Sequence, residues 1–173
     1  MGLFKILDSI LMRIMRPVVV VIGLAVAFML AAGIFSRSVL GTPVFGLEEI
    51  MLLAIMWFYM LGASLASRER SHLTADFVKI FSSNPKVWRA AAIVATAISL
   101  VVAVMMVVWS WDFFAFGVER NQKTPVFGIP WWVSQSSLLF ASVLFVAYLV
   151  RDLIQEIRGD ASITSGDPLA EVE

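Results

Sequence analysis

The sequence of 173 residues contains no cysteine and a single histidine, His72. Without cysteine the chain cannot form a disulfide, a thiol redox relay, a cysteine-ligated iron–sulfur cluster or a cysteine nucleophile. One histidine excludes a multi-histidine zinc site or a bis-histidine haem site within this chain. Charge is scarce too, since 15% of residues are charged and 13 basic residues balance 13 acidic ones. Nucleic-acid binding draws its affinity from clustered cations, so this balance argues against a nucleic-acid partner.

Apolar residues are abundant instead and make up 60% of the chain. Four long stretches lack Asp, Glu, Lys, Arg and His, and each can cross the hydrocarbon core of a membrane as a helix of about 20 residues. We expect Pro17 in the first turn of the first helix, where its missing N–H is tolerated. The predicted spans are about 17–37, 48–67, 89–111 and 131–150.

Basic residues are distributed unevenly between the two ends of these spans. Of the 13 Lys and Arg residues, ten fall on the side that holds both termini, and only Arg37, Arg120 and Lys123 fall on the other. Cytoplasmic segments of membrane proteins carry the excess of Lys and Arg. The sequence therefore predicts that both termini are cytoplasmic.

Two shorter segments have apolar residues at helical spacing. The first precedes the first span and contains Leu3, Phe4, Leu7, Ile10, Leu11 and Ile14. It predicts an amphipathic helix on the membrane surface, with a frayed lead-in to the first span as the alternative. The second lies in the cytoplasmic loop and contains Leu73, Phe77, Ile80 and Phe81.

The predicted fold class is all-α, an integral membrane four-helix bundle with amphipathic interfacial helices at the N-terminus and in the cytoplasmic loop. Residues 1–158 form a single four-span membrane domain. Residues 159–173 are small, polar and acidic, which predicts a disordered C-terminal tail.

The cores of the predicted spans contain no Asp, Glu, Lys, Arg or His. A protein that moves ions or substrates by itself normally carries such groups at mid-membrane, paired or facing a cavity. The spans are therefore unsuited to carrying a substrate alone. A membrane enzyme is also disfavoured, because the chain offers no cysteine, one histidine and no buried acid pair.

Several residues in and around the second span are candidates for helix contacts. Gly62 and Ala66 lie four residues apart, a spacing that permits close packing either within the bundle or against a partner. Trp57 and Tyr59 lie mid-span, where their polar atoms need acceptors, so this helix is either buried among its neighbours or faces another protein.

Polar residues flank the same span. Glu48 and Glu49 suit the positive end of its helix dipole, and Arg37 lies near enough across the loop to pair with one of them. At the other end, Arg68 and His72 fit ordinary positive-inside anchors by composition alone.

The sequence Thr-Pro-Val-Phe-Gly occurs twice, at residues 42–46 and 124–128. Both copies lie in outer loops before the second helix of a hairpin. Duplication of a helical hairpin would produce this pattern. Convergence of two turns on Pro and Gly is the favoured alternative, because the spans show no matching repeat.

An ordered set of motifs resembles a known family. It consists of Ser36-Arg37, Glu48-Glu49, the run from Leu61 to Arg68 (Leu-Gly-Ala-Ser-Leu-Ala-Ser-Arg), His72, Asp76-Phe77 and the later Pro130-Trp131. The pattern is similar to the small membrane subunit of tripartite ATP-independent periplasmic (TRAP) transporters. Length and four spans with cytoplasmic termini fit the same family.

The resemblance implies a non-catalytic, cofactor-free subunit in the bacterial inner membrane. Its expected partners are a large multi-span TRAP subunit that holds the substrate and sodium sites, a periplasmic substrate-binding protein and membrane lipids. The family handles organic acids, including C4-dicarboxylates and sialic acid. A free-standing membrane scaffold without a transport role is the alternative function.

Individual residues are candidates for subunit contact or bundle locking. The resemblance suggests Arg37, Glu48, Glu49, Arg68, His72 and Asp76, and the residues of the second span add Trp57, Tyr59 and Gly62. Candidates for docking in the outer loop are Arg120, Lys123, Pro130 and Trp131.

Overall fold

The computed structural model describes residues 2–68 and 85–158. It contains α1 (Gly2–Phe35), a short π-helical segment η1 (Ser36–Leu40), α2 (Leu47–Arg68), α4 (Pro85–Arg120) and α5 (Trp132–Arg158). Four helices are long and apolar enough to cross a membrane, and the prediction of an all-α fold with four such helices is confirmed. His72, Asp76, the expected helix of the cytoplasmic loop and the C-terminal tail lie outside the described residues.

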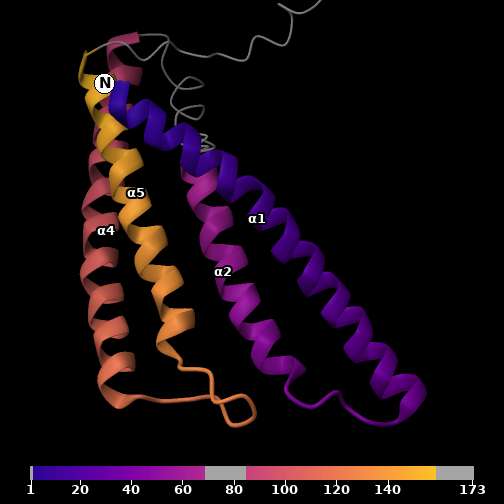
Figure 1. Cartoon of the computed structure of the whole chain (residues 1–173). Helices are drawn as coiled ribbons and strands as arrows, with labels where there is room; N and C mark the ends of the chain where they lie inside the picture. The colour runs from indigo at the N-terminus through magenta and orange to yellow at the C-terminus, as the bar shows by residue number, and fades with distance from the viewer. Residues whose placement is uncertain (1, 69–84, 159–173) are drawn as a thin grey trace, which may run out of the picture.

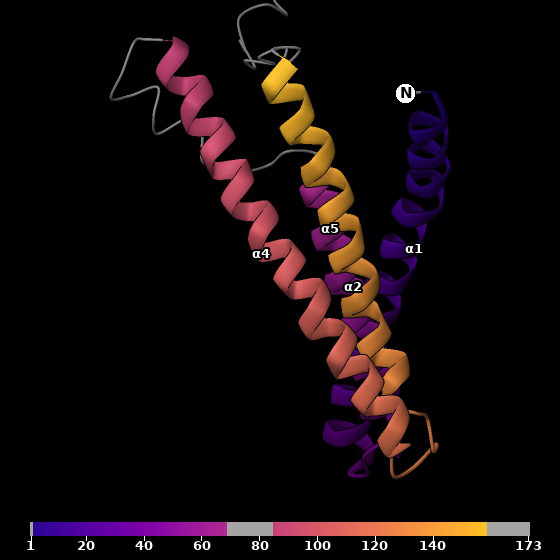
Figure 2. The ribbon, with the colours of Figure 1, turned by 90° about the vertical axis from the view of Figure 1, so that its left-hand side faces the viewer.

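The helices lie side by side in the order α4, α5, α2, α1 (Figure 1). Among the described residues, α5 packs against α4 and α2, and α2 packs against α1, while α1 and α4 are not in contact. Figure 2 shows from the side that α1 diverges from α4 and α5. The four helices thus form an open row, in which α5 has neighbours on two sides and α1 and α4 form the edges.

The first helix differs from the sequence prediction at its start. We expected a surface helix up to residue 16 and a separate span opening at Pro17, but α1 is one helix with Pro17 in its interior. Proline removes one backbone N–H and disfavours a helix interior. In hydrocarbon, however, breaking the helix costs more, because the backbone groups that lose their hydrogen bonds find no water to replace them. The helix ends at η1, after which Gly41 adopts a left-handed backbone with φ of 67°.

The last two helices extend beyond the predicted spans. α4 continues past residue 111 to Arg120, and α5 continues past residue 150 to Arg158. The α5 extension is rich in charged residues, whereas the α4 extension begins at Asp112, remains mostly apolar and ends in Glu119 and Arg120. A charged residue at the end of an apolar stretch therefore does not end either helix, and Arg and Glu are good helix formers.

Buried residues recur every seven positions along α4 and α5. They are Ala103, Ser110 and Gly117 on α4, and Gln135, Ser142 and Leu149 on α5. Ser110 and Gly117 lie against Ser142 and Gln135 across the two helices. The Oγ atoms of Ser110 and Ser142 are 3.0 Å apart. A Cβ on Gly117 would lie 1.8 Å from Oε1 of Gln135, so only glycine fits there without a shift. Small residues at a seven-residue repeat let two antiparallel helices approach closely in a membrane.

Candidate functional site

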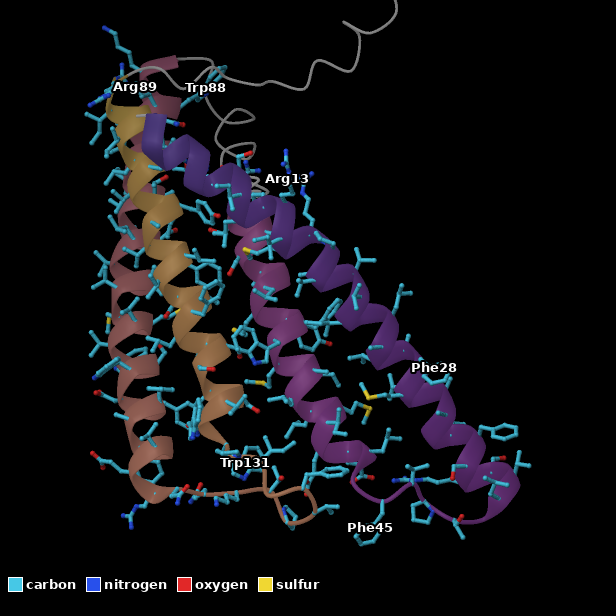
Figure 3. The ribbon with its side chains drawn as sticks, viewed as in Figure 1. Arg13, Phe28, Phe45, Trp88, Arg89 and Trp131 are labelled. Atoms are coloured by element: carbon cyan, nitrogen blue, oxygen red, sulfur yellow. The ribbon has the colours of Figure 1, made fainter. Side chains whose placement is uncertain are left out.

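Polar contacts gather at the two ends of the helix row. We call the end that holds the start of α1 and the ends of α2 and α5 the terminal end. The opposite end, formed by residues 36–46 and 121–131, is the turn end. Figure 3 places Arg13 and Arg89 at the terminal end, and Phe45 and Trp131 at the turn end. Of the described candidate residues, Trp57, Tyr59 and Gly62 lie within α2 between the two ends, and the others lie at one end or the other.

At the terminal end, Asp8 of α1 binds Arg68 of α2 through both carboxylate oxygens. Nε of Arg68 lies 3.0 Å from Oδ1, and Nη2 lies 2.7 Å from Oδ2. The two side chains are 27% and 13% exposed for Arg68 and Asp8, so most of the pair is shielded from solvent. Bidentate pairing of arginine with a carboxylate is both strong and directional. This pair therefore holds the beginning of α1 against the end of α2.

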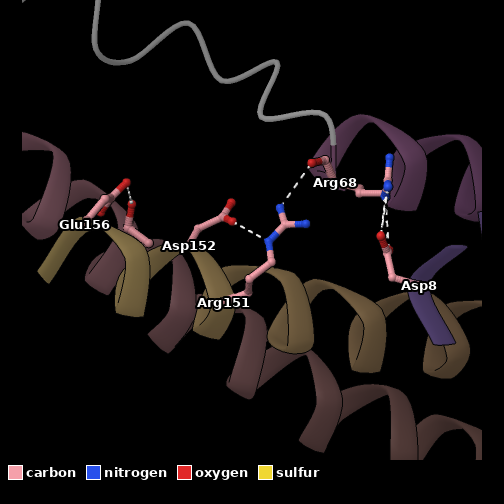
Figure 4. A network of polar contacts seen from close by, with 6 residues as sticks. Asp8, Arg68, Arg151, Asp152 and Glu156 are labelled. Atoms are coloured by element: carbon pink, nitrogen blue, oxygen red, sulfur yellow. Dashed lines mark hydrogen bonds and ion pairs between the residues drawn. The ribbon is translucent and has the colours of Figure 1, made fainter. Parts of the chain in front are cut away.

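Arg151 of α5 extends this cluster to the other helices (Figure 4). Its Nη2 donates to the backbone carbonyl of Arg68 at 3.2 Å, and its Nε donates to Asp152 at 2.7 Å. Its guanidinium also lies 5.3 Å from the ring centroid of the buried Tyr148. Together, Asp8, Arg68, Arg151 and Asp152 form what we call the terminal cluster, which links α1, α2 and α5.

α4 is attached to α5 at the same end by separate contacts. Arg89 donates to the backbone carbonyls of Glu156 and Ile157 at 3.1 and 2.6 Å. Thr96 donates to the carboxylate of Glu156 at 3.1 Å. The last backbone carbonyls at the C-terminal end of a helix have no intrahelical hydrogen-bond donor, and a cation is favourable there. These contacts hold the start of α4 against the end of α5.

At the turn end, the two adjacent glutamates have different partners. Glu48 forms an ion pair with Arg37, and the two side chains are 73% and 63% exposed. Glu49 instead accepts hydrogen bonds from the backbone N–H groups of Val126 at 2.7 Å and Phe127 at 3.0 Å. The expected pairing of Arg37 with one of the glutamates is therefore present. The second glutamate binds a loop 77 residues further along the chain.

The loop between α4 and α5 has its own internal order. Lys123 and Pro130 form an isolated antiparallel bridge. The hydroxyl of Thr124 accepts the N–H of Ile129 at 2.9 Å, and the N–H of Trp131 donates to the carbonyl of Gln122 at 3.0 Å. Candidate docking residues Lys123, Pro130 and Trp131 therefore lie on a folded turn.

The remaining candidates of the second span face different directions. The indole N–H of Trp57 donates to the carbonyl of Val133 at 3.2 Å, so this residue faces α5. Tyr59 is 62% exposed and points away from the helix row. A Cβ on Gly62 would meet nothing within 4 Å, whereas one on Gly23 would lie 2.8 Å from the ring of Phe58. Close packing of α1 on α2 thus depends on Gly23, and Gly62 borders open space.

Arg120 ends α4 at the turn end, and its guanidinium lies 5.4 Å from the ring centroid of Phe116. Within residues 2–68 and 85–158, no group of three or more His, Asp and Glu side chains can hold a metal ion. The polar groups described above pair with one another and with backbone atoms at the two ends. This arrangement joins the helices to one another.

Residues 26–159 match the family described as tripartite ATP-independent periplasmic transporters, DctQ component. The match covers more than three quarters of the chain, from within α1 to just beyond the end of α5. The chain belongs to the DctQ family. No curated protein matches the chain significantly.

As a DctQ component, the protein is a small subunit of a TRAP transporter and a multi-pass membrane protein. Family membership favours a transport role over the alternative of a free-standing scaffold. The DctQ component of TRAP transporters works with a large membrane subunit and a substrate-binding protein. DctQ is a class of transporter component and not a class of enzyme.

Sequence reasoning missed part of the terminal cluster. Neither Asp8 nor Arg151 is among the candidates that the sequence suggests. One sequence feature marks Asp8, which is the only acid among the first 47 residues. The partner itself, 60 residues away, has no local signature.

Proposed function

We propose that this DctQ component braces the large membrane subunit during sodium-coupled uptake of an organic acid, and helps dock the periplasmic binding protein. The acid is of the class that includes sialic acid (N-acetylneuraminate) and C4-dicarboxylates. The protein lies in the bacterial inner membrane with both termini in the cytoplasm. The terminal end is then cytoplasmic and the turn end faces the periplasm.

The open row of helices is the observation that carries the bracing role. α1 is strongly apolar, yet large side chains along it remain exposed, among them Leu24 (67%), Phe28 (76%) and Ile34 (68%). Figure 3 shows Phe28 on the side of α1 that faces away from α2. Lipid covers such surfaces, and so does a second membrane protein. A row whose helices are tied together at both ends, with no ionisable group in the cores of its spans, suits a rigid support better than a moving carrier.

The distribution of charge supports the proposed orientation. Within the described helices, Arg13, Arg16, Arg68, Arg89 and Arg151 all belong to the terminal end. The turn end has Arg37, Arg120 and Lys123, as the sequence predicted. The membrane potential and the insertion machinery favour the more basic end on the cytoplasmic side.

Reconstitution tests the proposed function. The large subunit is placed in proteoliposomes with and without this chain, the binding protein is added outside, and uptake of labelled sialic acid and of a C4-dicarboxylate is followed under an inward sodium gradient. We expect uptake only when all three components and the gradient are present. This chain alone should give no uptake. Full uptake without this chain would rule out a required bracing role, and uptake unaffected by sodium would rule out the coupling.

A further inference from the structure

Glu49 forms a direct connection between the two helical hairpins at the turn end. Glu49 lies in the first turn of α2. The two backbone N–H groups that donate hydrogen bonds to its carboxylate belong to the loop between α4 and α5. The two donors, Val126 and Phe127, are consecutive in the sequence. Successive backbone N–H groups that converge on one carboxylate form an anion-binding arrangement, and such charge-assisted bonds are stronger than neutral ones.

The same contact brings the two copies of Thr-Pro-Val-Phe-Gly together. Gly46 closes the first copy with φ of 80°, and a Cβ there would lie 2.3 Å from the ring of Phe127 in the second copy. Only glycine permits both this backbone conformation and this close approach. The repeated sequence therefore has a spatial counterpart, since the two copies face each other across the hairpins.

An open cavity of about 460 Å³ lies between these turns. Its walls combine residues of the first turn, such as Phe45 and Glu48, with residues of the second, such as Pro125 and Trp131. Neither hairpin alone forms this surface. Its shape depends on how the loop of residues 121–131 is held against the start of α2.

We propose that Glu49 is a positioning residue whose carboxylate holds the loop of residues 121–131 against the first turn, so that both hairpins present one composite surface at the turn end. The partner that binds this surface is the soluble substrate-binding protein, and this part of the inference rests on the proposed function. The loop carries Lys123 and Trp131, and the first turn carries the exposed pair Arg37–Glu48. A surface whose parts are already fixed relative to each other loses less conformational freedom on binding, which raises affinity.

The test compares Glu49→Gln with Glu48→Gln in the full chain, in lipid nanodiscs with the large subunit. Hydrogen exchange of the Val126 and Phe127 amides is measured by fragmentation that resolves single residues. A glutamine carries one carbonyl oxygen in place of the two carboxylate oxygens and no charge, so Glu49→Gln should accelerate exchange of at least one of these amides about tenfold or more. Glu48→Gln removes a neighbouring carboxylate that binds Arg37 instead, and it should leave both amides at the wild-type rate.

Wild-type exchange in Glu49→Gln, or equal acceleration in both variants, would overturn the positioning role. If Glu49→Gln fails to assemble with the large subunit, Glu49→Asp provides the same test, because it keeps the charge while shortening the reach by one methylene. Faster exchange at either amide in a correctly assembled complex supports the inference, and wild-type exchange overturns it.

Affinity for the binding protein separates this inference from the proposed function. Titration of the nanodisc complex should give a Kd about two- to tenfold higher for Glu49→Gln than for the wild type. Accelerated exchange with an unchanged Kd would show that Glu49 holds the loop but that the loop is not the docking surface. Unchanged exchange would overturn the role of Glu49, whatever the uptake assay gives.

Discussion

The ion pair between Asp8 and Arg68 should make a measurable contribution to the stability of the subunit. An exposed pair contributes about 0–1 kcal/mol, while removal of one partner from a fully buried pair costs about 3–5 kcal/mol. With side chains 13% and 27% exposed, this pair lies between those limits. We expect Asp8→Asn to lower the free energy of unfolding by about 2 kcal/mol, because the guanidinium then keeps its position without a charged acceptor.

A double-mutant cycle isolates this pair from its surroundings. Asp8→Asn, Arg68→Gln and the double variant are unfolded in mixed micelles by increasing SDS, with helix content followed by circular dichroism. The bond from Arg151 to the backbone carbonyl of Arg68 is unaffected by these side-chain changes. The coupling energy should be about 1–2 kcal/mol, within the range known for charged residues in direct contact. Arg37→Gln is the matched control at the exposed pair with Glu48, and it should cost less than about 0.5 kcal/mol.

Two outcomes would refute this reasoning. A coupling energy close to zero would mean that Asp8 and Arg68 do not share a bond in the folded protein. A cost for Arg37→Gln equal to that of Asp8→Asn would mean that burial does not distinguish the two pairs.

Two further predictions use the same unfolding assay. Gly117→Ala should cost about 1 kcal/mol or more, because its Cβ would lie 1.8 Å from Oε1 of the buried Gln135, whereas Gly62→Ala should be neutral or stabilise α2 by up to about 1 kcal/mol. Equal effects at the two glycines would contradict the packing described for α4 and α5. Trp57→Phe should cost about 1 kcal/mol through loss of the 3.2 Å bond to the carbonyl of Val133, and an unchanged midpoint would show that this bond is not made.

The helical content of the fold was predictable because transfer of charge into hydrocarbon is costly. Long charge-free stretches therefore identify helices with little ambiguity. The helix ends were harder to predict, since a single charged residue such as Asp112 or Arg151 marks the end of an apolar stretch but does not end α4 or α5. The helix start predicted at Pro17 is wrong for a related reason. Proline destabilises a helix interior, but breaking the helix within an apolar segment costs more free energy.

The partners at the turn end illustrate a different limit. Glu48 and Glu49 are adjacent, identical in type and equally placed relative to the helix dipole. Sequence reasoning could expect one of them to pair with Arg37, which is close in the chain. It could not assign the other to Val126 and Phe127, because that contact depends on α5 lying beside α2. Helix order within an apolar layer depends on shape and small residues, which one sequence does not reveal.

The order of helices in the row has a consequence for biosynthesis. α1 and α2 are neighbours in the chain and in space, so they can associate in the bilayer as soon as both have left the ribosome. α4 has no contact with either of them among the described residues. Its helix neighbour is α5, and the loop of residues 121–131 that follows α4 binds Glu49 of α2. Release of α5 from the translocon is therefore the event that completes the packing of α4, and a chain that ended before residue 132 would leave α4 without its helix neighbour.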